Sequence, residues 1–315
     1  MTGRMRALSL GPDGKMIVVD ADIPAPGRGQ VLVEIHVSAV NQMDLQVRAG
    51  GWAGQVKRFR RAGPVLTGFE FSGVARSDGA RIRAGQRVIG YSPVLNGPRT
   101  HAQFATVAER DLQVLPAALD DEAAAGLVVM GLTAVDILER LCPLRRGDRC
   151  LVAGAAGGVG VHTVQLAVAQ GAEVVAVASG SNAAGLRSLG AVEVRAYEGG
   201  DWWREGDRFD LVIDAPAVSG FAQAAPHLAP RGMYVSTNPT ADLAGFARAA
   251  LSSRRAGYLM LLRSHPVGLQ RLIDLALAGT LKPVIDSIFP LDDADAAFDR
   301  FATRGKLGRV LLKIA

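Results

Sequence analysis

The chain has 315 residues, of which 49% are apolar and 21% charged, and its formal net charge is +5. This balance is typical of a globular protein and excludes a disordered or fibrous chain. No apolar run reaches the roughly 18 residues of a membrane span, and two cysteines are too few for a disulfide scaffold.

Short β-branched segments separated by turns fill the first 115 or so residues. The expected strands are residues 17–19, 30–37, 73–76, 86–90 and 103–107. Their length and spacing predict a small β-rich, barrel-like domain. The chain starts without the apolar core of a signal peptide, so we expect a cytoplasmic protein with reduced cysteines.

One basic cluster lies at residues 57–61. It fits either a solvated loop or a positive rim that attracts an anionic cofactor or substrate. No nucleic-acid-binding module surrounds it. We therefore expect neither a nucleic acid nor a membrane as a partner.

The pattern changes at Asp120, a plausible N-cap with acidic residues in the following turn. Helical stretches then alternate with apolar strands, which predicts an α/β domain with a parallel sheet over residues 119–284. The expected strands are residues 151–153, 174–177, 211–214, 234–236 and 258–262.

The tail returns to the pattern of the first segment. Residues 283–285 are extended, 292–303 are helical and 309–314 form a strand. A strand at the end of a chain is usually tied into a sheet. We therefore assign residues 1–118 and 285–315 to one β-rich domain, with a cofactor cleft between it and the α/β domain.

The most informative segment is residues 149–178. An apolar strand enters GAAGGVG at 154–160, a helix follows over 161–170, and a second strand covers 173–178. Glycines allow close approach to a pyrophosphate, and the helix N-terminus offers it free N–H groups. The segment predicts a dinucleotide site, against the alternative of a tight strand-to-helix turn without a ligand.

The end of the second strand bears on the choice of cofactor. NAD-binding folds usually place an acidic residue there, whereas residues 178–182 contain none and offer Ser179, Ser181 and Asn182. Arg187 and Arg195 follow as counter-charges for a 2′-phosphate. This favours NADPH, although the same residues could simply cap the next helix.

Several motifs together resemble those of one family. They are NQMD at 41–44, RAG at 48–50, GFEFSGV at 68–74, RAGQRV at 83–88, GLTA at 131–134, the 153–160 loop, SLGA at 188–191 and GRVL at 308–311. The chain resembles the medium-chain dehydrogenase/reductase superfamily, in its zinc-free quinone oxidoreductase branch. The resemblance runs nearly end to end and implies a Rossmann-type domain plus a GroES-like barrel.

Two positions at which this chain differs from the zinc-dependent members of the superfamily indicate the zinc-free branch. Asn41 stands where they carry a ligand cysteine, and Phe69 stands where they carry a ligand histidine. Neither side chain can replace those ligands. We therefore expect no metal, with His101, His162, His227 and His265 as structural or surface residues.

The resemblance also implies roles for individual residues. Asn41 lies beside the nicotinamide, and Asn41 or Gln46 could donate a hydrogen bond to the substrate as a catalytic group. The implied cofactor contacts are Asn41, Thr133, Gly157, Gly158, Val159, Ser179, Ser181, Asn182, Tyr197, Thr237, Asn238, Lys306 and Arg309. Two features of many relatives are absent: a lysine, where this chain has Asn182, and an active-site tyrosine, where it has Gln46.

Two acidic residues of these motifs have alternative interpretations. Asp44 is either a helix cap, an ion-pair partner of Arg48 or a catalytic group. Glu70 is expected to be structural rather than catalytic in a protein without zinc.

The hypothesis from the sequence is an NADPH-dependent, zinc-independent reductase that transfers hydride to a quinone or an α,β-unsaturated carbonyl compound. An enoyl reductase of a biosynthetic pathway and a non-catalytic NADPH-binding protein remain as alternatives. The apolar stretch 257–262 is expected at an edge of the sheet, where it would form part of a homodimer contact.

Overall fold

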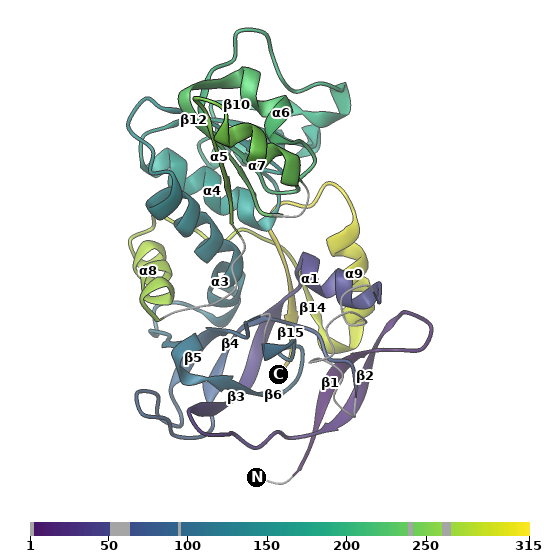
Figure 1. Cartoon of the computed structure of the whole chain (residues 1–315). Helices are drawn as coiled ribbons and strands as arrows, with labels where there is room; N and C mark the ends of the chain where they lie inside the picture. The colour runs from purple at the N-terminus through teal and green to yellow at the C-terminus, as the bar shows by residue number, and fades with distance from the viewer. Residues whose placement is uncertain (1–2, 51–63, 94–95, 239–241, 260–265) are drawn as a thin grey trace.

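The computed structural model describes residues 3–50, 64–93, 96–238, 242–259 and 266–315. Two large sheets, a separate two-stranded sheet and the helices between and around them form the described part of the molecule (Figure 1). The basic cluster at 57–61 and His265 lie outside the described residues.

A six-stranded sheet forms the α/β part. Its strands are β8 (Arg149–Ala153), β9 (Glu173–Ala178), β10 (Glu193–Ala196), β11 (Phe209–Asp214), β12 (Leu228–Ser236) and β13 (Arg255–Tyr258). All pairs are parallel, in the order β10-β9-β8-β11-β12-β13. This is the doubly wound order, in which the crevice for a dinucleotide opens where the strand order reverses, beside β8. The predicted parallel sheet is confirmed.

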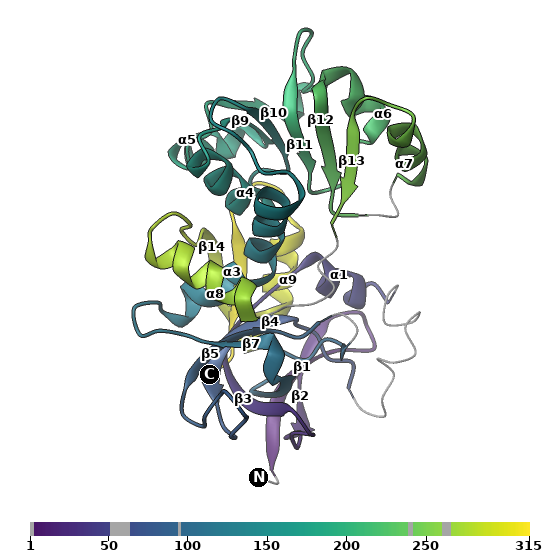
Figure 2. The same cartoon turned by 60° about the vertical axis from the view of Figure 1, so that its left-hand side comes forward.

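The sequence pattern misplaced or missed some strands of this sheet. The strand expected at 258–262 begins earlier, at Arg255, and residues 260–265 lie outside the described part. β10 was not predicted because its four residues alternate polar and apolar side chains at the sheet's edge. β13 forms the other edge, as expected, and lies beside α7 in Figure 2.

A seven-stranded sheet forms the β-rich part. Its strands are β3 (Gln30–Ala39), β4 (Glu70–Ala75), β5 (Arg87–Tyr91), β6 (Phe104–Ala108), β7 (Leu112–Val114), β14 (Ile285–Pro290) and β15 (Arg309–Lys313). β15 pairs antiparallel with β3, which confirms that the tail rejoins the first segment. The hairpin of β1 (Arg4–Leu10) and β2 (Met16–Asp22) forms a separate two-stranded antiparallel sheet.

The α-helices of the described residues differ widely in length. They are α1 (Gln42–Arg48), α3 (Asp121–Val135), α4 (Gly158–Ala169), α5 (Ala183–Ser188), α6 (Phe221–Ala224), α7 (Leu243–Ala250), α8 (Pro266–Leu277) and α9 (Ala294–Ala302). None of these helices is long and apolar enough to cross a membrane.

Helix α3 packs against both halves of the molecule. Asp120 caps it by accepting a hydrogen bond from the Ala123 N–H at 2.6 Å, as predicted. Its buried residues contact β3, β4 and β15 on one side and α4 and α8 on the other. We propose that the two sheets mark two domains, residues 1–118 with 285–315 and residues 119–284, and that α3 forms much of the contact between them.

Helix α8 offers a test of this packing. Leu272 is fully buried and lies directly over Gly131 of α3, whereas Leu277 on the same helix is 50% exposed. Leu272→Ala should lower the free energy of unfolding by about 2–5 kcal/mol, because it leaves a cavity between the helices. Leu277→Ala should change it by less than about 0.5 kcal/mol. Urea denaturation of both variants measures the difference, and equal midpoints would contradict this packing.

Candidate functional site

The glycine-rich loop follows β8 at the carboxyl edge of the parallel sheet. Gly154 has a φ of +71°, which favours glycine. A Cβ on Gly160 would lie 2.3 Å from the Gly154 carbonyl oxygen, so only glycine lets α4 pack this closely on the loop. Gly157 is the N-cap of α4, and Gly157, Gly158 and Val159 are half-buried. The backbone therefore fits a pyrophosphate at the start of α4.

The C-terminal segment returns to this loop from the other sheet. The Gly308 N–H donates to the Ala156 carbonyl at 2.8 Å. A Cβ on Gly158 would lie 2.6 Å from Nη1 of Arg309, so this guanidinium lies against the first turn of α4. The structure thus brings together Gly158 and Arg309, two of the predicted cofactor residues, from the two sheets.

Arg309 is the centre of a buried polar cluster. Its Nη2 donates to Oδ1 of Asn41 at 3.0 Å and forms an ion pair with Glu70. The Val129 N–H of α3 donates to the second Glu70 oxygen. All three side chains of the cluster are at most 1% exposed. Burial raises the pKa of Glu70, and the Arg309 charge opposes that rise.

The side chain of Asn41 is engaged within this buried cluster on both its oxygen and its nitrogen. Its Oδ1 accepts from Arg309, and its amide donates to the Ala39 carbonyl at 3.2 Å. The side chain is fully buried, so it orients the guanidinium in this structure. Gln46, the other predicted catalytic residue, is exposed on α1. Direct donation to a substrate by either residue stays a prediction.

Asp44 holds the start of α1. It accepts from the Asn41 N–H at 2.8 Å and from the Gly68 N–H at 2.7 Å, so its role as a helix cap is confirmed. Burial raises its pKa to about 7, against the opposing effect of both donors. The alternative of an ion pair with Arg48 is wrong, because Arg48 reaches across to Asp295 and Asp299 of α9.

The two positions that correspond to zinc ligands contain other groups. Phe69 is fully buried before β4, and Asn41 is committed to Arg309. In the described part of the chain, no three His, Cys, Asp or Glu side chains gather in a way that could hold a metal ion.

The histidines of the described residues have structural surroundings. His101 is hydrogen-bonded between the Thr67 hydroxyl and the Ala39 carbonyl, and His162 contacts the Gly158 carbonyl. Burial lowers the pKa of both residues to about 4. His227 stacks on Trp203 with ring centroids 4.7 Å apart.

The predicted 2′-phosphate residues gather beyond β9. Ser181 donates to the Ser179 hydroxyl at 3.1 Å, and Asn182, which is buried, donates to the Lys306 carbonyl at 3.1 Å. Tyr197 follows β10 at the same edge and lies under the Arg304 guanidinium, 5.4 Å from it. Asn182 therefore holds the C-terminal loop in place, whereas Ser179 is half-buried and Ser181 is exposed.

The expectation that Arg195 serves as a counter-charge for a 2′-phosphate was wrong. Arg195 is buried in an ion pair with Asp207, at 2.5 Å, and with Glu193, at 3.1 Å, so it is not available as a counter-charge. Arg187 is exposed in the last turn of α5. Residues 178–182 contain no carboxylate, as expected from the sequence. The fold nevertheless brings a carboxylate to them, because Glu198 accepts a hydrogen bond from the Ser179 hydroxyl.

The remaining predicted residues come from three parts of the chain: α3, the segment after β12 and the C-terminal loop. Thr133 is buried in α3, and its hydroxyl donates to the Val129 carbonyl. Thr237 follows β12 and donates to the Ala215 carbonyl, and Asn238 beside it is exposed. Lys306 lies over the Phe301 ring at 4.9 Å, and burial lowers its pKa.

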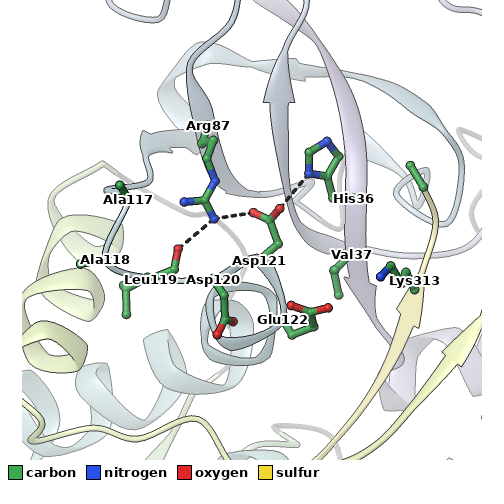
Figure 3. A pocket seen from close by; sticks show the side chains of 11 residues that line it. His36, Val37, Arg87, Ala117, Ala118, Leu119, Asp120, Asp121, Glu122 and Lys313 are labelled. Atoms are coloured by element: carbon green, nitrogen blue, oxygen red, sulfur yellow. Dashed lines mark hydrogen bonds and ion pairs between the residues drawn. The ribbon is translucent and has the colours of Figure 1, made fainter.

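A pocket of about 710 Å³ opens elsewhere, where α3 begins (Figure 3). Its wall includes Asp121, which accepts from His36 at 2.7 Å and pairs with Arg87 at 2.8 Å. Arg87 also donates to the Leu119 carbonyl. None of the predicted site residues lines this pocket. Its charged groups hold the N-terminus of α3 on the β-rich sheet.

Comparisons with known proteins agree with this architecture. A family model described as "Alcohol dehydrogenase GroES-like domain" matches residues 27–117, and one described as "Zinc-binding dehydrogenase" matches residues 189–312. The quinone oxidoreductase of Rattus norvegicus is 28% identical, over 98% of this chain and 97% of the relative. The chloroplast envelope quinone oxidoreductase homolog of Arabidopsis thaliana is 26% identical, over 94% and 93%.

Solved structures give the same result. The quinone oxidoreductase from Coxiella burnetii has a TM-score of 0.90 and 27% identity, and the match covers 99% of this chain and 100% of that one. A mycobacterial protein complexed with NADPH has a TM-score of 0.82 and 24% identity, over 98% and 100%, which shows a shared fold. The chain is therefore an oxidoreductase-family protein. It belongs to the medium-chain dehydrogenase/reductase superfamily, in the quinone oxidoreductase-like branch.

The buried cluster generates a prediction about stability. Glu70→Gln leaves the Arg309 charge buried without its partner, and it should lower the free energy of unfolding by about 3–5 kcal/mol. Adding Arg309→Met removes the remaining charge and should restore much of that loss, because no unpaired charge is then left buried.

A matched control is the exposed pair of Arg4 and Asp22, whose carboxylate side chain is 86% exposed. Asp22→Asn should change the free energy of unfolding by at most about 1 kcal/mol. Urea denaturation of all four proteins compares the two pairs. A Glu70→Gln variant as stable as Asp22→Asn would show that the buried pair does not hold the fold.

Proposed function

We propose that this chain is an NADPH-dependent, zinc-independent reductase that transfers hydride to a quinone or an α,β-unsaturated carbonyl compound. The observation that carries the proposal is the contact between the glycine loop and the Arg309–Glu70–Asn41 cluster. It supports the proposal because the loop that would hold the dinucleotide lies against a cluster that includes Asn41, an amide where zinc-dependent members of the family carry a ligand cysteine. Relatives named quinone oxidoreductases support the choice of acceptor.

The proposed cofactor contacts follow the edge of the parallel sheet. The loop at Gly157, Gly158 and Val159 would hold the pyrophosphate, with Arg309 beside it. The hydroxyls of Ser179 and Ser181 and the Tyr197 ring would meet the adenosine end. A structural neighbour complexed with NADPH supports this choice of cofactor.

The chemistry that this site can support depends on its donor set. A bound nicotinamide supplies the hydride, and the protein positions donor and acceptor. Amides and a guanidinium can stabilise developing charge by hydrogen bonding, but they polarise a saturated ketone less strongly than a metal ion does. A conjugated acceptor needs less help because the developing charge spreads over its π-system. Quinones and enones therefore match this site better than simple ketones.

The test is consumption of NADPH with three acceptors. We expect turnover with 1,4-benzoquinone or 2-cyclohexenone and none with cyclohexanone, which differs from cyclohexenone only in lacking the conjugated double bond. Exhaustive chelation should leave the rate unchanged. Loss of activity that added zinc restores would overturn zinc independence. Turnover of enoyl thioesters alone would favour a biosynthetic enoyl reductase. Binding of NADPH without turnover of any acceptor would favour a non-catalytic NADPH-binding protein.

We also propose a homodimer that includes the outer edge of β13. This strand ends the parallel sheet, and among the described strands only β12 pairs with it. An exposed strand edge tends to be covered. Light scattering at micromolar concentration should give twice the 33.0 kDa of one chain, and a single-chain mass would refute the dimer.

A further inference from the structure

One carboxylate occupies the turn where a 2′-phosphate would bind. Oε1 of Glu198 accepts from the Ser179 hydroxyl at 2.5 Å, and Oε2 accepts from the Gly180 N–H at 3.2 Å. Ser181 in turn donates to Ser179 at 3.1 Å. Hydroxyl and backbone N–H groups are the donors that a phosphate needs, and Glu198 already uses two of them.

The register of two parallel strands places Glu198 there. Ala196, the last residue of β10, pairs with Ala178, the last residue of β9. The residues just beyond the two strands therefore meet at the same edge, although Ser179 and Glu198 are 19 positions apart in the sequence. Glu198 is exposed, so its side chain can turn away without breaking a buried contact.

Two arginines lie on the same side of the sheet as this carboxylate, and they differ in whether they are already paired. Arg195 is fully committed to Asp207 and Glu193. The hydrogen bond from Ser179 keeps the pKa of Glu198 below its ordinary value, with a smaller contribution from Arg304, which lies over the Tyr197 ring. The side chain is thus an anion at neutral pH, and a 2′-phosphate carries a further charge of about −1.5 to −2.

We propose that Glu198 sets the cofactor preference: its carboxylate competes with the 2′-phosphate of NADPH for the Ser179 hydroxyl and the Gly180 N–H. The same carboxylate is a suitable acceptor for the free 2′-hydroxyl of NADH, the role that an acidic residue at the end of the second strand has in NAD-binding folds. This inference rests on the proposed function only in placing a dinucleotide at this edge. Its consequence is a preference for NADPH over NADH that is smaller than the Ser179 and Ser181 hydroxyls alone would give.

The test uses ligands that carry only the adenosine end. Isothermal titration compares adenosine 2′,5′-bisphosphate with AMP, which lacks the 2′-phosphate, in the wild type and in Glu198→Gln. The variant should bind the bisphosphate roughly tenfold more tightly, the scale of one regained charge-assisted hydrogen bond. Its affinity for AMP should stay the same or fall. Glu173→Gln is the matched control, since Glu173 is an exposed residue at the opposite end of β9.

Two further variants separate charge from hydrogen bonding. Glu198→Ala should give at least the gain of Glu198→Gln, because it frees both donors. Ser179→Ala in the Glu198→Gln background should remove most of the gain, because the phosphate loses the hydroxyl. With whole cofactors, the ratio of kcat/KM for NADPH to that for NADH should rise in Glu198→Gln through a lower KM for NADPH.

The outcomes distinguish this inference from the proposed function. An unchanged or lower ratio of bisphosphate to AMP affinity in both Glu198 variants would overturn it, whatever the enzyme reduces. Failure of every acceptor to oxidise NADPH, with the expected titration results, would overturn the reductase and leave the role of Glu198 intact. Absence of binding of either nucleotide to all the variants would overturn both.

Discussion

The ion pair between Glu70 and Arg309 is the interaction on which the arrangement of this molecule depends. Glu70 begins β4 and Arg309 begins β15, so the pair fixes two strands of the β-rich sheet. Both side chains are buried, and a charge in such surroundings is stable only with its partner. Because Arg309 also touches Asn41 and lies against Gly158, its position sets the distance between the β-rich sheet and the glycine loop.

This pair also limits the chemistry. A guanidinium is not deprotonated in proteins and has no lone pair to donate to a metal ion, so it can act neither as a general acid nor as a metal ligand. It can orient an amide and contribute a fixed positive charge beside the pyrophosphate loop. Glu70 neutralises much of that charge, so the main effect of the cluster is to fix the positions of Asn41 and the glycine loop. An acceptor that spreads its own developing charge matches such a site, which is the physical reason to favour conjugated carbonyls and quinones.

The sequence predicts the scaffold well and the contacts between distant segments poorly. The glycine loop, the Asp120 cap and the returning strand at 309–313 depend on local pattern, and the structure contains all three. Arg195 was misassigned because its partner Asp207 lies beyond β10, across a loop that carries no periodic signal. Glu198 was overlooked because only the register of β9 and β10 brings it to Ser179. Side chains that meet through sheet topology cannot be paired from spacing alone.

The charged groups at the two ends of the proposed cofactor site differ in their exposure to solvent. At the pyrophosphate end, Arg309 is buried and its neighbours are fixed, so dissolved salt cannot screen its interaction with Glu70. At the adenosine end, Glu198 is exposed, and its repulsion of a phosphate acts through water and falls off over a Debye length of about 8–10 Å at moderate ionic strength. Salt thus weakens discrimination against the 2′-phosphate without loosening the cluster that holds the two sheets together. The buried pair holds the β-rich sheet against the glycine loop, whereas the proposed selectivity depends on a side chain that solvent can reach and a single rotamer change can remove.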